Sequence, residues 1–248
     1  MKLTGNTVFV TGGGSGIGRG LAEALHKLGN QVIISGRRPE RLQATIDANP
    51  GMHAVSLDIA DPTDIKKVAE QLIADHSSLN VLINNAGIML LDDAAGPVDD
   101  DLLSSTVATN LLGTIRMTSA LIEHLKTKDG AVVANVSSVL GFVPMATSAV
   151  YSATKAALHS YTLSQRYLLR GSKVSVIEIV PPWVRTELLN STEEPRAMPL
   201  DAFIAGTIEQ LGADANEILV GPAVAMRANP GPNEHAWVNE FNDTLAAG

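Results

Sequence analysis

The stretch that decides the fold is Thr11-Gly12-Gly13-Gly14-Ser15-Gly16-Ile17-Gly18, which follows the apolar, β-branched run Thr7-Val8-Phe9-Val10. A helical pattern of leucine and alanine comes next. A strand that passes through a glycine-rich turn into a helix is the setting of a dinucleotide pyrophosphate site, because the helix N-terminus offers free amides and a positive dipole end. We expect Gly12 to allow the tight turn, Gly16 the close approach of a ligand, and Gly18 the packing of helix on strand.

A second informative feature is the pair Tyr151 and Lys155, with Ser138 thirteen residues before the tyrosine. Residues four apart project from one face of a helix, so the phenol and the ammonium can converge. A nearby cation favours the phenolate, and we therefore expect Lys155 to lower the pKa of Tyr151 toward neutrality, as an acid/base catalyst requires. Taken alone, the same pair could be an inward-facing aromatic residue and a solvated lysine.

The strands and helices expected along the chain alternate, which predicts a parallel sheet with right-handed crossovers. Continuous aliphatic runs such as Val81-Leu82-Ile83 indicate strands covered on both faces. We therefore predict an α/β fold over residues 1–248, one domain with a doubly wound Rossmann-type parallel sheet and helices on both faces. The expected strands are 6–11, 31–35, 53–57, 80–84, 130–136 and 173–180; the expected helices are 16–29, 39–48, 62–76, 98–126, 150–170 and 200–211.

Composition excludes several classes of function. The chain has 248 residues and a net charge of −8, which argues against a nucleic-acid or anionic-membrane partner. The absence of cysteine excludes disulfides and thiolate metal sites, and the six histidines lack metal-ligand spacing, so no metal is predicted. The first strand starts too close to Met1 for a signal peptide, and no apolar run reaches transmembrane length. We expect a cytoplasmic protein.

The glycine spacing Gly-x-x-x-Gly-x-Gly, Asn84-Asn85-Ala86-Gly87, Asn110, Ser138 and the Tyr151–Lys155 pair occur in an order that resembles the short-chain dehydrogenase/reductase family. The resemblance is to its single-domain branch of roughly 250 residues. It implies hydride transfer between a nicotinamide cofactor and a carbonyl or secondary alcohol. The Ile-Leu-Val-Gly-Pro stretch near residue 220 is similar to bacterial oxidoreductases named for the D-alanine–lipoteichoic acid gene cluster, a name that indicates no substrate.

The resemblance implies a role for four residues. Tyr151 would protonate the carbonyl oxygen, and Ser138 would donate a hydrogen bond to the same oxygen. Lys155 would also bind the nicotinamide ribose. Asn110 would kink its helix and hold a water that links Lys155 to solvent. The catalytic set is therefore expected to be Asn110, Ser138, Tyr151 and Lys155.

The cofactor contacts are carried over in the same way. Asp58 would accept from the adenine amino group, although it could merely cap the next helix. Val184 and Thr186 would bond the nicotinamide carboxamide, and Pro182 replaces a glycine of the family, which stiffens the turn. The expected contacts are Gly12, Gly14, Ser15, Gly16, Ile17, Gly18, Arg37, Arg38, Asp58, Ile59, Asn85, Ala86, Gly87, Tyr151, Lys155, Pro181, Val184 and Thr186.

The end of the second strand, Ile33-Ile34-Ser35-Gly36-Arg37-Arg38, bears on the choice of cofactor. An acidic residue here would hold the ribose 2′-hydroxyl of NAD, but this position is Gly36 and Arg37 follows. An arginine can clamp a 2′-phosphate, so the sequence favours NADP(H) over NAD(H). The alternative is that both arginines are solvated residues at the start of a helix.

The substrate end is expected beyond Pro181, where the resemblance implies a mobile flap at 181–210 over a small-molecule carbonyl or alcohol. Two other function classes are open: a non-catalytic nucleotide sensor, and an epimerase or dehydratase with the same tyrosine–lysine pair. The side chains expected either in an apolar substrate pocket or in the core are Leu140, Met145, Trp183, Leu188 and Leu189.

The expected helices 98–126 and 150–170 carry apolar residues on more than one side, Leu158 among them, and such helices need a second partner. In the family these helices pair with their copies across a twofold axis. The C-terminal region shows no recognisable final strand, which commonly builds the second interface of tetramers. We therefore expect a homodimer, with a tetramer as the alternative.

Overall fold

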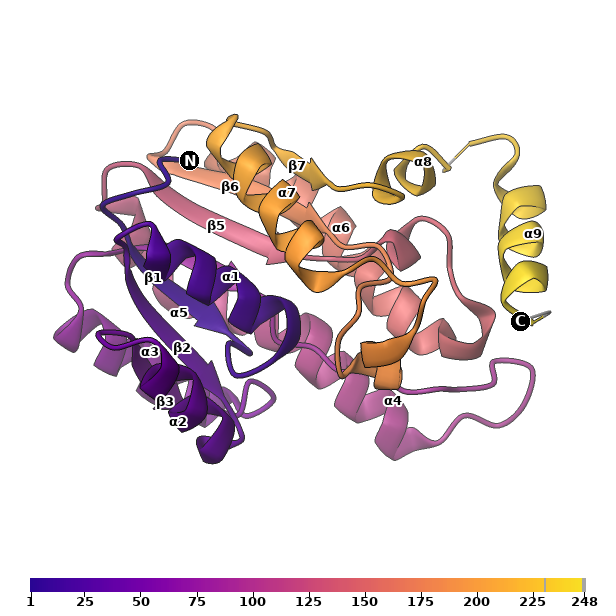
Figure 1. Ribbon diagram of the computed structural model, residues 1–248, viewed down its shortest axis with the longest axis horizontal. Coiled ribbons are helices and arrows are strands. Elements are labelled where there is room, and N and C mark those ends of the chain that lie inside the picture. The colour runs from indigo at the N-terminus through magenta and orange to yellow at the C-terminus, as the bar shows by residue number, and fades with distance from the viewer. Residues whose placement is uncertain (230, 247–248) are drawn as a thin grey trace.

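One parallel sheet of seven strands forms the centre of the molecule (Figure 1), in the order β3-β2-β1-β4-β5-β6-β7. The computed structural model describes residues 1–229 and 231–246. The predicted doubly wound sheet is confirmed, and each of the six expected strands is present to within two residues. The strands are β1 (Thr7–Thr11), β2 (Gln31–Gly36), β3 (His53–Ser56), β4 (Leu79–Asn84), β5 (Ala131–Val136), β6 (Val174–Val180) and β7 (Glu217–Leu219).

Helices cover both faces of the sheet. On one face, α1 (Gly16–Lys27), α2 (Pro39–Ala48) and α7 (Leu200–Gly212) share an apolar core with the strands. On the other, α3 (Pro62–Asp75), α5 (Thr114–Lys126) and α6 (Ala149–Leu169) pack against a second core. Every residue of β1 and β5 is buried, because strands covered on both faces have no solvent side. Within the described ranges, no helix is both long enough and apolar enough to cross a membrane.

The expected helix 98–126 is divided by a π-helical turn. It consists of α4 (Asp100–Val107), the π turn Ala108–Gly113, and α5. Asn110 lies in the middle of the π turn, where the sequence predicted a kink. A β-carbon on Gly113 would lie 2.5 Å from the carbonyl oxygen of Ile59, so the turn brings the helix backbone directly against the loop after β3.

The C-terminal elements were not predicted. β7 pairs with β6, and α8 (Ala223–Arg227) and α9 (Glu234–Ala246) follow it, with α9 standing away from the sheet (Figure 1). The expectation that the chain lacks a final strand is therefore wrong. Three residues are too few to show periodicity. Besides its pairing with β6, β7 is held by Gln210 of α7, whose amide bonds both the N–H and the carbonyl of Leu219, at 3.0 and 2.7 Å.

The segment 181–210, expected to be a flap, ends in a helix that the sequence also predicted. About its last third is α7, whose Phe203 and Leu211 are fully buried, so one face of this helix packs in the core. The substrate flap is defined from here on as residues 181–199. Its base is closed by two backbone hydrogen bonds of Met198, which donates to Trp183 O at 2.8 Å and accepts from Arg185 N at 2.9 Å.

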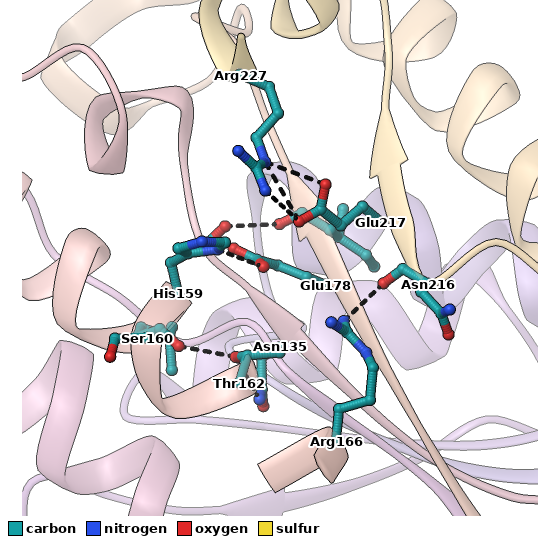
Figure 2. A network of polar contacts seen from close by, with 12 residues as sticks. Asn135, His159, Ser160, Thr162, Arg166, Glu178, Asn216, Glu217 and Arg227 are labelled. Carbon is teal, nitrogen blue, oxygen red and sulfur yellow. Dashed lines mark hydrogen bonds and ion pairs between the residues drawn. The ribbon is translucent and has the colours of Figure 1, made fainter. Parts of the chain in front are cut away.

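A polar network joins the unpredicted C-terminal elements to the centre of the fold (Figure 2). Glu178 of β6 accepts a hydrogen bond from His159 Nδ1 of α6 at 2.8 Å, and Arg227 of α8 binds both carboxylate oxygens of Glu217. The ligand atoms of His159, Glu178 and Glu217 lie within 4.8 Å of one another, a grouping that the sequence spacing did not indicate. Because Arg227 already supplies a cation to Glu217, we interpret the group as a structural network.

Candidate active site

The strand order reverses between β1 and β4, and ligands of open α/β sheets bind at the carboxyl ends of such strands. Gly12 has a φ of +68°, which permits the tight turn after β1. A β-carbon on Gly18 would lie 2.4 Å from Gly12 O and 2.3 Å from the Asn85 side-chain amide, so only glycine allows α1 to pack here. The first turn of α1 holds no acidic residue, which leaves its positive end available to an anion.

The end of β4 is fastened to the glycine turn by Thr11 and Asn85. Thr11 Oγ1 accepts from the backbone N–H groups of Asn85 and Ala86, at 3.0 and 3.1 Å. The Asn85 side chain donates to the carbonyl oxygens of Thr11 and Gly12, at 3.0 and 3.3 Å. The Asn85 amide is thus engaged in bracing the turn, while Ala86 and Gly87 line the adjoining cavity.

One cavity of about 860 Å³ extends from the end of β2 to the start of α6, a size suited to a small-molecule site. Arg37 and Arg38 line one end, and Ser138, Tyr151 and Lys155 line the other. The structure thus brings the predicted residues together, except that Gly18, Asp58 and Asn110 do not line the cavity. The other predicted residues that line it are Gly12, Gly14, Ser15, Gly16, Ile17, Ile59, Asn85, Ala86, Gly87, Pro181, Val184, Thr186, Leu140, Met145, Trp183, Leu188 and Leu189.

Asp58 forms a turn instead of facing the cavity. Its Oδ1 accepts from Ala60 N at 3.0 Å, and its own N–H donates to Asp64 Oδ2 at 2.8 Å. The neighbouring Leu57 and Ile59 line the cavity in its place. The capping alternative for Asp58 is wrong as well, because the next helix is capped by Asp61, whose Oδ1 accepts from Thr63 N at 2.7 Å.

Ser138 and Tyr151 lie at the deep end of the cavity. Ser138 Oγ accepts from Leu140 N at 3.1 Å, which fixes the side chain and leaves its hydroxyl proton free to donate. Burial raises the pKa of Tyr151 to about 12, and a hydrogen bond with the Ser138 side chain opposes that rise. The expected lowering by Lys155 is not found, because burial dominates and Lys155 Nζ lies 5.5 Å from the centre of the tyrosine ring.

Lys155 is a buried cation held by the end of β5. Its Nζ donates to Val136 O at 2.8 Å, and only 4% of the residue is exposed. Burial lowers the pKa of Lys155 to about 8, while the carboxylate of Glu178 acts in the opposite direction. An ammonium has three donors, so two remain for groups on the cavity side.

Asn110 braces the loop after β4 from within the π turn. Its Oδ1 accepts from Ile88 N and its Nδ2 donates to Ile88 O, both at 2.8 Å, and Nδ2 also contacts Thr154 Oγ1 at 3.3 Å. The side chain is fully buried, and Ile88 is the residue of this group that lines the cavity. Asn110 thus positions the cavity wall beside Lys155.

Several residues of the cavity wall were not predicted from the sequence. Arg41 lies in the first turn of the expected helix 39–48, and Phe241 and Leu245 are one turn apart on α9, so helical periodicity is a signal that could have found these three. Met226 and Glu187 lie in a short helix and a loop, where no periodicity exists. The unpredicted lining residues discussed here are Arg41, Glu187, Ile88, Met226, Phe241 and Leu245.

Comparisons with known proteins agree with this geometry. The family model for short chain dehydrogenases matches residues 6–197. The oxidoreductase named DltE of Bacillus subtilis is 38% identical over 239 residues, which cover 92% of this chain and 95% of that protein. The sulfoacetaldehyde reductase of Chromohalobacter salexigens is 30% identical over 214 residues, 85% of each chain.

Among solved structures, a short chain dehydrogenase from Burkholderia cenocepacia in complex with NADP superposes with a TM-score of 0.86 at 27% identity, covering 97% of this chain and 99% of that one. The family match spans the glycine turn, the end of β4, Ser138 and the Tyr151–Lys155 pair. The sequence resemblance is thereby confirmed: the chain belongs to the short-chain dehydrogenase/reductase family of oxidoreductases.

Proposed function

We propose that this protein transfers a hydride between NADP(H) and a small carbonyl compound or secondary alcohol, with Tyr151 as the general acid/base. The observation that carries the proposal is the convergence of Ser138, Tyr151 and Lys155 at one end of a cavity that the glycine turn also lines. The sulfoacetaldehyde reductase among the relatives supports a carbonyl substrate. The whole chain would act as one catalytic domain, and its lack of cysteine suits the cytoplasm.

The residues present fit a nicotinamide dinucleotide. Gly14, Ser15 and Gly16 line the cavity at the N-terminus of α1, where backbone amides favour a pyrophosphate. Arg37 and Arg38 lie at the end of β2 and would hold a 2′-phosphate. Val184 and Thr186 also line the cavity and would hold the carboxamide, and Lys155 has donors to spare for the nicotinamide ribose.

The bound cofactor would supply or accept the hydride, and the protein would control the proton. In reduction, the Tyr151 hydroxyl would give its proton to the carbonyl oxygen while the Ser138 hydroxyl donates a hydrogen bond to it. A phenol with a pKa of about 12 keeps its proton at neutral pH, which suits the reductive direction. The Lys155 ammonium would stabilise the negative charge that develops when the proton leaves.

Two alternative functions are less well supported by the site. A non-catalytic nucleotide sensor has no need for Tyr151 and Lys155 together with Ser138, and all three are present. An epimerase or dehydratase would use the same pair, but such enzymes tend to have a larger C-terminal substrate domain. Here the residues after Pro181 form a short flap, three helices and one strand within the described part of the chain. Net consumption of cofactor with a carbonyl substrate would separate these functions.

Changing Tyr151 to Phe removes the proton donor and keeps the ring, so we expect turnover to fall at least about 100-fold. Affinity for the cofactor should remain close to that of the wild type. The measurement is steady-state turnover on the best substrate from a panel of aldehydes and ketones, with cofactor binding followed by fluorescence titration. Tyr167→Phe, on the exposed side of α6, is the matched control. Near-normal turnover of Tyr151→Phe would contradict the mechanism.

The pH dependence of reduction should report Lys155. Its pKa of about 8 means that the charge is present below this pH and is lost as the pH rises through it. We expect kcat/KM, which reports the free enzyme, to fall about tenfold per pH unit on the alkaline side. Because Glu178 raises the pKa of Lys155, Glu178→Gln should move this decline to lower pH. If kcat/KM falls at the same pH in Glu178→Gln as in the wild type, the decline does not report the ionisation of Lys155.

Replacing Arg37 with Asp should exchange an attraction for a repulsion at the 2′-phosphate. We expect the ratio of NADPH to NADH affinity to fall by about 10- to 100-fold, as a lost charge-assisted contact implies. Titration of both cofactors against wild type and variant measures the ratio. Lys27→Asp makes the same change of charge outside the cavity and should leave the ratio unchanged. A wild type that binds NADH more tightly than NADPH would overturn the choice of cofactor.

We also propose that the protein forms a homodimer through α4, the π turn and α6. α4 and the π turn pack beside α6, and these elements leave Leu112, Leu163 and Tyr167 exposed, although the predicted Leu158 is buried in the protein's own core. With β7 present, the argument against a tetramer no longer holds.

Light scattering should give at least twice the 26.0 kDa chain mass. Leu163→Glu should reduce the measured mass, whereas Val224→Glu on α8 should leave it unchanged. A monomeric wild type would contradict the proposal.

A further inference from the structure

A cluster of three arginines lies where β2 ends and α2 begins. Arg37 and Arg38 follow β2, Arg41 is one turn further along α2, and all three line the cavity. Glu187 reaches the cluster from the substrate flap. Its Oε1 lies 2.7 Å from Arg41 Nη1, and its Oε2 lies 3.7 Å from Arg38 Nη1. Arg38 in turn donates from Nη2 to Ser15 Oγ in the glycine turn, at 3.2 Å. The flap is therefore tied by a carboxylate to the cofactor end of the cavity.

The arginines bound by Glu187 occupy the position at which dinucleotide sites distinguish NADP from NAD. A 2′-phosphate carries close to two negative charges and three acceptor oxygens, and an arginine fork binds such a group in bidentate fashion. The Glu187 carboxylate offers one charge and two oxygens to the same donors. It therefore takes the place of an anionic ligand, with less charge than that ligand would bring.

We propose that Glu187 and the 2′-phosphate of NADP(H) compete for Arg38 and Arg41, so that binding of the phosphate releases the substrate flap, whereas NAD(H) leaves it tied. The inference rests on the proposed function, because it requires the cofactor to lie along the cavity. It makes Glu187 a residue that distinguishes between the two cofactors without belonging to the arginine cluster itself.

The ion pairs of Glu187 with Arg38 and Arg41 are weak enough for a phosphate to replace the carboxylate. Glu187 is 49% exposed, and the side chains of Arg38 and Arg41 are 53% and 46% exposed. Exposed ion pairs contribute little stability and are easily replaced, whereas a buried pair would resist displacement. The two residues after Glu187 are Leu188 and Leu189, which also line the cavity. Release of Glu187 would thus free a part of the flap that faces the cavity.

Two small ligands isolate the phosphate from the rest of the cofactor: adenosine 2′-phosphate and adenosine 5′-phosphate. Calorimetry should show that Glu187→Gln binds the 2′-phosphate about two- to fivefold more tightly than the wild type, the range expected for loss of an exposed ion pair. Glu187→Asp keeps the charge and shortens the side chain, so it should behave like Glu187→Gln. Glu193→Gln, in the same flap, should bind like the wild type. If Glu187→Asp also binds like the wild type, charge repulsion alone explains the effect and the competition is overturned.

Hydrogen exchange of the flap provides the second measurement. In the wild type, adenosine 2′-phosphate should speed amide exchange over residues 185–194, and adenosine 5′-phosphate should not. In Glu187→Gln, exchange should be fast without any ligand. Binding of the 2′-phosphate with unchanged exchange would overturn this inference and leave the proposed hydride transfer intact. Failure of the wild type to bind the 2′-phosphate at all would overturn both the inference and the choice of NADP(H).

Discussion

The close packing of three backbone segments at the carboxyl ends of β1 and β4 is the constraint on which the site depends. The turn after β1, the first residues of α1 and the end of β4 approach so closely that a β-carbon on Gly18 would overlap both neighbours. Thr11 and Asn85 then fix these segments with four hydrogen bonds. Because these side chains of the protein hold the segments together, the free amides of α1 are aimed into the cavity without help from a ligand, and binding need not organise them.

Burial is the main influence on the pKa values of the side chains at the reacting end of the cavity. Removing Tyr151 and Lys155 from water disfavours the charged form of each, so the phenol holds its proton more tightly and the ammonium holds its proton less tightly. Glu178 opposes part of this cost for Lys155, and its own hydrogen bond to His159 ties it to the C-terminal network. The charge of Lys155 is thereby linked through Glu178 to a polar network that includes β7 and α8.

The sequence predicted the features that rest on local chemistry and missed those that rest on contacts between distant segments. Continuous aliphatic strands, the glycine turn and the four-residue spacing of Tyr151 and Lys155 are local patterns, and the structure has them where they were expected. The pKa of Tyr151 depends on how deeply the ring is buried, which spacing does not reveal. β7 is held by pairing with β6 and by a side chain of α7, and Glu187 meets Arg41 from a position 146 residues away, so neither leaves a periodic pattern in the sequence.

The π turn at Ala108–Gly113 adds one residue to the helix formed by α4 and α5. Successive residues of an α-helix are rotated by about 100°, and a π turn accommodates one extra residue within an otherwise continuous helix. Loss of one residue from this turn would restore a regular helix in which α4 and α5 stay continuous, and it would remove the bulge that carries Asn110. Asn110 would then turn away from Ile88, and the cavity wall beside Lys155 would lose its support. The extra residue of the π turn is therefore what holds this part of the cavity wall in place.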